Sequence, residues 1–391
     1  MKPRVLMLHN RYLTRGGEDE STDLEVEILR ENGHEVDLFE ICNKEPSRIT
    51  DKANIAIGAI WSKSSFETIS RILASSRYDI VHVQNFFPLF SPSVYSAAKK
   101  ADVPLVQSIR NYRLICPSAN LFRNGHFCDD CVGKKFAFPS IFHACYRSSR
   151  LGTSTIAAMQ IVNRLTGNWK NGVDRYIAVT EYVRDQLIRG GFPAGKIAVK
   201  PNFVKPPKSN LEIVPSRNFA MYVGRLTQEK GAHWLVQKWK NLDIDLRLCI
   251  IGDGDMPLSS PEGSDHIISL GVKPLEEVYK IMANARFVVL PSLWPEPFGR
   301  VIVEAFANGT PVLVARTGGA QELVEDGKNG FLYDPADSTD FALKVRRLTY
   351  DDELIEKMSK AARTTFETLY TSEANYKMLS RIYNDVLVAR S

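Results

Sequence analysis

The stretch VGRLTQEKG, residues 223–231, joins an apolar run to the start of a helical pattern. The run, Phe219–Val223, is typical of a buried strand, and Gly231 stands where the helix opens. Between them Arg225 and Lys230 place two fixed cations in one loop. Such a loop suits a pyrophosphate, because Arg binds an anion through two N–H groups, Lys adds a point charge and Gly lets the backbone approach closely. Taken alone, a basic loop paired with acidic neighbours remains the alternative interpretation.

The same alternation of apolar runs and helical patterns extends along the whole chain and predicts parallel sheets built from βαβ units. We expect strands in the first half at 4–9, 35–41, 79–85, 104–109, 175–180 and 197–200. We expect strands in the second half at 219–223, 245–251, 266–270, 287–291, 311–315 and 330–333. The Pro- and Lys-rich stretch 200–209 predicts a linker, and 351–390 has a helical pattern. The sequence therefore predicts an α/β protein with two doubly wound, Rossmann-like domains, and a ligand at the carboxyl ends of their strands.

A second motif, EPFGRVIVE at residues 296–304, contains two glutamates. Its pattern places Glu296 in a loop before a helix and Glu304 inside that helix. Phe298 and Gly299 would then present backbone N–H groups at the helix N-terminus, where partial positive charge gathers. A carboxylate at the position of Glu304 can accept hydrogen bonds from two sugar hydroxyls. Its apolar neighbours make a plain surface position a poor alternative.

Gly16 and Gly17 follow the first expected strand and precede a helix. Paired glycines there allow backbone N–H groups to approach an anion, although most such pairs are simply turns.

Composition narrows the class of protein. With 391 residues, 44% hydrophobic and 24% charged, the chain is long enough for two ordinary globular domains. No apolar run reaches the roughly 18–20 residues that span a bilayer. The first residues, MKPRVLML, read as a strand rather than a signal peptide, so we expect a cytoplasmic protein. The net charge of +5 fits an anionic small ligand or contact with anionic lipid, and no basic run or aromatic stripe indicates nucleic-acid binding.

Together these motifs resemble those of retaining glycosyltransferases of the large GT-B class called family 4 (group 1). The resemblance runs nearly end to end, and the order and spacing of its motifs carry it. Besides Gly16-Gly17, residues 223–231 and the two glutamates, the motifs are IGDG at 251–254, Gly271-Val272, GTPV at 309–312, GG and Glu at 318–322, and Asn329-Gly330.

The resemblance implies a GT-B fold with two domains facing a central cleft, and it implies roles for single residues. It assigns Arg225 and Lys230 to the diphosphate of a UDP- or GDP-sugar and Glu304 to the ribose. Glu296, with the backbone of Phe298 and Gly299, would contact the transferred sugar. The remaining donor-side positions are the nucleobase turn at Gly271 and Val272, the amides of Gly16 and Gly17, and Arg300. The implied domains are 1–203 for the acceptor, with a Cys-rich insertion at 112–150, and 204–368 for the donor, followed by a helix at 369–391 that returns to the first domain.

The implied reaction is transfer of a hexosyl or related group with retention of configuration, and we expect it to need no metal. Two D-x-D stretches, at 243–245 and 253–255, have the form of a metal site, but neither has further candidate ligands nearby. Arg225 and Lys230 can already stabilise the leaving diphosphate.

On the acceptor side we expect His82 and Asn85, at the end of the third strand, and Arg110 and Asn111, after the fourth. His82 has a structural role as its alternative. Relatives often have His at the position of Arg110, and arginine cannot act as a base near neutral pH.

Four cysteines, Cys116, Cys128, Cys131 and Cys145, fall within one insertion. Their spacing, with a C-x2-C pair, leaves two alternatives: a structural zinc site or reduced thiols. Aromatic and basic residues of the same insertion predict peripheral contact with the inner face of a membrane that carries a lipid-linked acceptor, with a solvated loop as the alternative.

These features favour an enzyme that transfers a sugar to a glycan or lipid-linked acceptor in cell-surface polysaccharide or glycolipid synthesis. The alternatives are a non-catalytic subunit that binds a sugar nucleotide and another GT-B enzyme such as a sugar-nucleotide epimerase. Epimerases generally lack the combination of Arg225 and Lys230 with the two glutamates.

Overall fold

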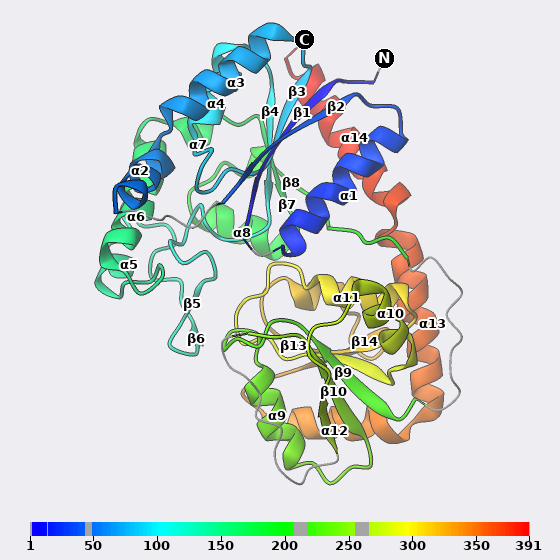
Figure 1. The fold of residues 1–391 in the computed structure, drawn as a ribbon. Helices are drawn as coiled ribbons and strands as arrows, with labels where there is room; N and C mark the ends of the chain where they lie inside the picture. Colours follow the sequence, from blue (N-terminus) through cyan, green and yellow to red (C-terminus); the bar gives the residue numbers. More distant parts are fainter. Residues whose placement is uncertain (1, 14, 44–48, 207–216, 255–265, 391) are drawn as a thin grey trace. The chain divides into compact units, whose positions relative to one another are not determined.

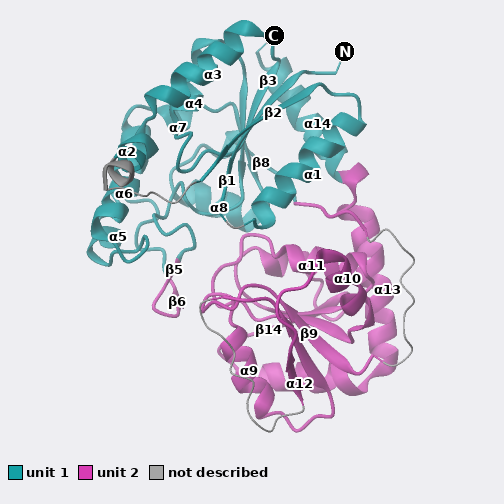
Figure 2. Ribbon diagram, viewed as in Figure 1, with its two compact units in different colours: residues 1–121, 128–201, 375–391 teal, residues 122–127, 202–374 magenta. Residues whose placement is uncertain are grey.

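The computed structural model describes residues 2–13, 15–43, 49–206, 217–254 and 266–390, without the side chains of 49–53. The chain forms two compact units (Figure 2). Unit 1 comprises Met1–Leu121, Cys128–Pro201 and Asn375–Ser391, and unit 2 comprises Phe122–Phe127 and Asn202–Ala374. Asp255 and residues 207–209 of the expected linker lie outside the described residues. No described helix is long and apolar enough to cross a membrane.

Unit 1 contains a six-stranded parallel sheet in the order β2-β1-β3-β4-β7-β8. The strands are β1 (Val5–Arg11), β2 (Val36–Cys42), β3 (Ile80–Asn85), β4 (Leu105–Ile109), β7 (Arg175–Ala178) and β8 (Ile197–Val199). The helices are α1 (Gly17–Glu31), α2 (Ile49–Ile60), α3 (Lys63–Ser75), α4 (Ser93–Lys100), α5 (Phe138–Phe142), α6 (Arg150–Leu165), α7 (Asn168–Asn171), α8 (Glu181–Arg189) and the 3-10 turn Ala194–Lys196. Figure 1 shows α1 and α14 (Ser372–Val388) on one face of this sheet and α3, α4 and α7 on the other.

Unit 2 contains a second parallel sheet, in the order β11-β10-β9-β12-β13-β14. Its strands are β9 (Phe219–Val223), β10 (Arg247–Ile251), β11 (Ile267–Ser269), β12 (Phe287–Leu290), β13 (Val312–Ala315) and β14 (Gly330–Tyr333). The helices are α9 (Ala232–Lys240), α10 (Leu275–Asn284), α11 (Arg300–Ala307), α12 (Ser338–Tyr350), α13 (Asp352–Leu369) and the 3-10 turn Ala320–Leu323. The hairpin β5 (Phe122–Arg123) and β6 (His126–Phe127) was not expected from the sequence.

Both sheets reverse their strand order at one point, and that point locates the candidate sites. In unit 1 the order reverses between β1 and β3, and in unit 2 between β9 and β12. Open α/β sheets bind ligands outside the carboxyl ends of the strands at such a point. In unit 2 these ends lead into the loops 224–231 and 291–299, and in unit 1 into residues 12–17 and 86–92.

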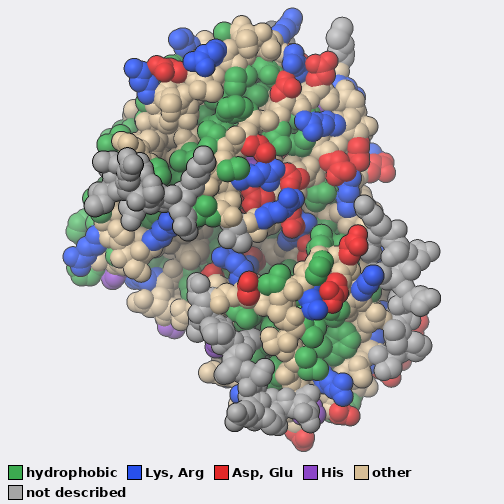
Figure 3. Space-filling model, in the orientation of Figure 1, with side chains coloured by type: hydrophobic (Ala, Val, Ile, Leu, Met, Phe, Trp, Pro, Cys, Tyr) green, Lys and Arg blue, Asp and Glu red, His purple; other side chains and the backbone are tan. Residues whose placement is uncertain are grey.

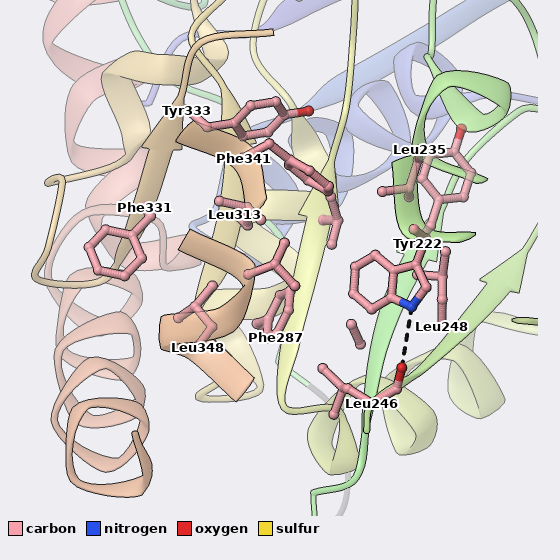
Figure 4. Packing of buried hydrophobic residues seen from close by; sticks show 14 of the residues in the cluster. Tyr222, Leu235, Leu246, Leu248, Phe287, Leu313, Phe331, Tyr333, Phe341 and Leu348 are labelled. Atoms are coloured by element: carbon pink, nitrogen blue, oxygen red, sulfur yellow. Dashed lines mark hydrogen bonds between the residues drawn. The ribbon is translucent and has the colours of Figure 1, made fainter. Parts of the chain in front are cut away.

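The core of each unit is apolar and continuous across its sheet. In unit 2, Tyr222, Leu248, Phe287 and Leu313 from the strands pack against α9 and α12, and Trp239 donates its indole N–H to Leu246 O at 3.2 Å (Figure 4). In unit 1, α1 and α14 share one core with β1. The residues of α14 in this core are Leu379, Ile382, Tyr383 and Val386. The C-terminal helix therefore completes the first unit, although its sequence follows the second.

Candidate functional site

The loop after β9 is fixed in place by glycine. Gly231 has φ +74°, and a Cβ there would lie 1.9 Å from Pro291 O. Only glycine fits, because both the left-handed backbone and the close approach exclude a side chain. A second close approach, of Gly252 to Gly224 O, packs the turn after β10 onto the start of the loop. These contacts hold the loop that carries Lys230 against the residues following β12.

Lys230 and Glu296 meet at this point. The Lys230 ammonium donates to both carboxylate oxygens of Glu296, each at 2.8 Å. Ser292 Oγ and Trp294 Nε1 also donate to Glu296 Oε2, each at 2.9 Å. The ammonium lies 5.2 Å from the centre of the Trp294 ring. Glu296 is buried, so four donor contacts on one carboxylate fix its orientation.

A glycine turn supports Glu296 from behind. Gly318 has φ +58°, and a Cβ there would lie 2.3 Å from Pro295 C. Gly319 N–H and Ala320 N–H donate to Glu296 O at 2.7 and 3.2 Å. Support of Glu296 by Ser292, Trp294 and this turn was not expected from the sequence. The only local signal was that the Gly-Gly pair belongs to the family pattern.

The other donor-side residues are placed as follows. Glu304 is buried in α11, and Arg300 Nε donates to its Oε1 at 2.9 Å. Gly299, with φ +79°, begins α11, and the Phe298 side chain is buried 6.2 Å from the Tyr370 ring. The Phe298 side chain thus serves packing within unit 2.

Arg225 differs from this buried group. Its side chain is 68% exposed, and its guanidinium lies 3.7 Å from Glu229 Oε1. The structure therefore does not place Arg225 in the buried cluster around Glu296.

The turn expected to meet the nucleobase lies after β11. Gly271 has φ +65° and accepts Gly252 N–H at 3.0 Å, while the Val272 side chain is exposed.

In unit 1 an open pocket lies at the carboxyl ends of β3 and β4. Three of the four expected acceptor-side residues, Asn85, Arg110 and Asn111, line it. The other lining residues are Tyr12, Gln84, Phe86, Phe87, Gln107, Ser108, Ile109, Arg113 and Leu114.

His82, the fourth expected residue, does not line the pocket. Its ring is fully buried, with Nδ1 2.7 Å from Tyr383 Oη and Nε2 2.9 Å from Ser108 Oγ. Burial lowers the pKa of His82 to about 3, so the ring is neutral at physiological pH. We therefore correct the expected contact with the acceptor to the structural alternative, because both ring nitrogens are already engaged inside unit 1.

Arg110 is held by a buried ionic cluster. It donates to Glu25 Oε1 at 2.9 Å and to Gln84 Oε1. Lys200 donates to the same Glu25 oxygen at 2.8 Å and to Asn375 Oδ1 at 2.9 Å. Burial alone would raise the pKa of Glu25, but the charges of Lys200 and Arg110 hold it well below its ordinary value. Sequence reasoning missed Glu25 and Lys200, because their partners come from distant parts of the chain.

Gly16 caps α1. Its N–H donates to Asp19 Oδ2 at 3.0 Å, and Asp19 Oδ1 lies 2.7 Å from His9 Nε2. The amide of Gly16 is therefore already bound within the protein, contrary to its expected use for an anion. Gly17, the first residue of α1, is exposed.

The structure describes all four cysteines of the insertion and shows no disulfide bond among them. Among the described residues, no three His, Cys, Asp or Glu side chains form a group that could hold a metal ion. Cys116 Sγ lies 3.1 Å from Ser118 Oγ, and burial raises the pKa of Cys131 to about 11. Zinc binding by Cys116, Cys128, Cys131 and Cys145 and its alternative, reduced thiols, both stay predictions.

Comparison with known proteins identifies the class. The fold is that of GT-B glycosyltransferases: the structure of Anabaena Alr3699/HepE in complex with UDP aligns with a TM-score of 0.68 over 98% of this chain and 100% of that one, at 18% identity. Sucrose-phosphate synthase from Thermosynechococcus elongatus aligns with a TM-score of 0.69 over 99% and 100% of the two chains, at 17% identity. The prediction of two Rossmann-like doubly wound domains is confirmed.

Sequence comparison gives the family. The model for glycosyl transferases group 1 matches residues 207–365, and that for Glycosyltransferase Family 4 matches residues 25–207. The chain belongs to the group 1, family 4 type of GT-B glycosyltransferases, as the motifs predicted. An uncharacterized 42.6 kDa protein in the cps region of Klebsiella pneumoniae is 27% identical over 343 residues, 79% of this chain and 83% of its own. The uncharacterized glycosyltransferase MJ1178 of Methanocaldococcus jannaschii is 29% identical over 276 residues, 66% and 76% of the two chains.

Proposed function

We propose that this glycosyltransferase moves a sugar, with retention of configuration, from a UDP- or GDP-sugar to a glycan or lipid-linked acceptor in polysaccharide or glycolipid synthesis. The observation that carries the proposal is the Lys230–Glu296 pair at the point where the sheet of unit 2 reverses its order. The neighbours named above support the donor and the pathway. HepE was solved in complex with UDP-glucose, and the Klebsiella relative lies in a cps region.

The donor diphosphate would bind to Lys230 and Arg225. Lys230 is already positioned, since Glu296 and Trp294 hold its ammonium. Cleavage of the anomeric C–O bond adds negative charge to the leaving diphosphate. A preorganised ammonium stabilises that charge more in the transition state than in the ground state, which is what accelerates the reaction. The exposed Arg225 would join on binding, and the acceptor proton would pass to an oxygen of the leaving phosphate.

The transferred sugar and the nucleoside would bind beside this pair. Glu296 would accept hydroxyl hydrogen bonds of the sugar, together with the backbone at Phe298 and Gly299. Glu304, oriented by Arg300, would bind the ribose hydroxyls, and the turn at Gly271 and Val272 would contact the base. In this scheme the two cations supply the charge that a divalent metal supplies in other transferases, so we propose transfer without a catalytic metal.

The test is release of nucleoside diphosphate from UDP-, GDP- and ADP-sugars, with and without lipid extract, in the presence of EDTA. We expect release from a UDP- or GDP-sugar, with the anomeric configuration retained in the product as read by NMR. Tight binding of a donor without turnover under every condition would instead support the non-catalytic subunit. Inversion of configuration would refute the retaining mechanism.

We further propose peripheral contact with the inner face of an anionic membrane, through the segment 131–173 of unit 1. This segment contains no Asp or Glu and six basic residues, Lys134, Lys135, Arg147, Arg150, Arg164 and Lys170. Phe138, Phe142 and Leu151 are 63, 64 and 81% exposed, and Figure 3 shows hydrophobic and basic side chains together over α5. Exposed aromatic side chains surrounded by Lys and Arg, with no acidic residue in the segment, suit the interface of an anionic bilayer.

Flotation with liposomes tests this contact without any donor. We expect binding to vesicles with anionic lipid and little to pure phosphatidylcholine. The double variant F138S/F142S should bind about tenfold less, because two exposed rings no longer insert. Leu343→Ser, which removes an exposed apolar side chain of unit 2, is the matched control. Equal binding by F138S/F142S and the wild type would refute this surface.

A further inference from the structure

The pocket of unit 1 contains a cation that the proposed mechanism does not use. Arg113 lines this pocket together with Phe87. Its guanidinium lies 4.6 Å from the centre of the Phe87 ring and 5.2 Å from that of Tyr146, and it donates to Pro117 O. The guanidinium is thus held by two rings and one backbone carbonyl.

Arg113 has no ionic partner among the residues that the structure describes. Within the described part of the chain, no carboxylate forms an ion pair with its guanidinium, whereas Arg110 in the same pocket is paired with Glu25 at 2.9 Å. Burial lowers the pKa of Arg113, and Glu18 opposes this only weakly. Burying a charge without a counter-charge is costly, so an unpaired cation beside a pocket indicates a site for an anion.

The surrounding groups leave this cation available. Asn111 donates to Glu18 Oε1 at 2.7 Å and accepts the backbone N–H of Arg113 at 2.9 Å. Asn85 donates to Asn10 O and accepts Phe87 N–H. Glu18 is the carboxylate that influences the pKa of Arg113, and its hydrogen bond goes to Asn111 and not to Arg113.

Ring contacts and hydrogen bonds use different parts of a guanidinium. Aromatic rings stack on its faces, while its five N–H groups project from the edge in a plane. Pro117 O engages Nη1. The remaining N–H groups retain the fork geometry that binds a phosphate or carboxylate through two hydrogen bonds.

We propose that Arg113 binds an anionic group of the acceptor, a phosphate or a carboxylate, in the pocket of unit 1. The assignment to an acceptor rests on the proposed function, since only a transferase needs one. A phosphate would come from a lipid-linked saccharide and a carboxylate from an acidic sugar. Arg113 is then a specificity-determining residue for anionic acceptors.

The test is calorimetric titration of the full chain, with UDP saturating so that the donor loop cannot bind the probe. The probes are octyl phosphate and glucuronic acid, which separate the two sources of charge. We expect one of them to bind the wild type, and Arg113→Gln to weaken that binding at least about tenfold. Arg113→Lys should fall between the two, because it keeps the charge and loses the fork.

Arg189→Gln is the matched control, because Arg189 pairs on the surface with Asp129 at 2.6 Å. The inference is overturned if neither probe binds the wild type, or if Arg113→Gln and the wild type bind equally. It is also overturned if Arg113→Gln weakens UDP as strongly as the probe, since Arg113 would then serve the donor. If Arg113→Gln does not fold, the comparison of Arg113→Lys with the wild type decides in the same way. Failure here leaves donor turnover untouched, so the two proposals are separable.

Discussion

Glu25 offers the sharpest test of how unit 1 is held together. Its carboxylate is buried and receives Lys200 at 2.8 Å, Arg110 at 2.9 Å and Gln84 Nε2 at 2.7 Å. Glu25→Gln keeps the shape of the side chain and removes its charge, which leaves two buried cations facing a neutral amide. Removing one partner of a buried ion pair costs about 3–5 kcal/mol, mostly because the remaining charge is uncompensated.

Calorimetry measures this effect as a shift in the melting transition of unit 1. A domain of 150–250 residues shifts by about 2–4 °C per kcal/mol, so we expect Glu25→Gln to lower that transition by about 10 °C. The surface variant Glu67→Gln is the control. Its pair with Lys63, at 3.8 Å and exposed, should be worth less than about 1 kcal/mol.

A second variant tests the cause of the loss. Glu25→Gln/Lys200→Met removes one of the stranded cations, so the double variant should recover part of the stability lost by Glu25→Gln. A shift below about 2 °C for Glu25→Gln would refute the reasoning, as would strictly additive losses in the double variant.

The pH dependence follows with a defined sign. The pKa of Glu25 is lowered in the folded state. Its stabilisation is therefore complete above its ordinary pKa of about 4.3 and is lost as the pH falls toward the folded value. The free energy of unfolding of unit 1 should therefore fall less steeply with decreasing pH in Glu25→Gln than in the wild type.

Three further predictions concern other groups. Lys230→Ala should lower turnover at least about a hundredfold with the fold intact by circular dichroism, because the leaving diphosphate loses its fixed ammonium; near-normal rates would remove Lys230 from the site. Gly231→Ala should displace the donor loop and weaken UDP binding measured by calorimetry, because the added Cβ would lie 1.9 Å from Pro291 O. The control Gly195→Ala should leave UDP binding unchanged, since no atom lies within 4 Å of its added Cβ. Equal UDP affinity in the two variants would show that the loop is not fixed at Gly231. His82, with a pKa lowered to about 3, should stay neutral in NMR spectra from pH 8 to 5. Its contribution to the stability of the folded state should decline as the pH falls from about 6.5 toward 3. A ring that titrates near 6.5 in the folded protein would contradict its burial.

The sequence alone determined where the strands and helices follow one another along the chain and where the donor loops lie between them. These features are local, because each depends on residues that are close in the sequence. They are an apolar run of strand length, a helical period and a glycine at a tight turn. Each of the twelve strands expected for the two sheets is present, with bounds that differ by a few residues. The loop carrying Lys230 and the helix carrying Glu304 could be located in the same way.

Only the tertiary structure decided which side chains meet. Lys230 contacts Glu296 across 66 residues, Arg110 contacts Glu25 across 85, and His82 contacts Tyr383 across 301. No local pattern contains such pairings, because they depend on strand order and on the return of α14 to unit 1. That return buries His82, which we had expected to contact the acceptor. The folding of the insertion leaves Arg113 without a carboxylate partner in the described part of the chain.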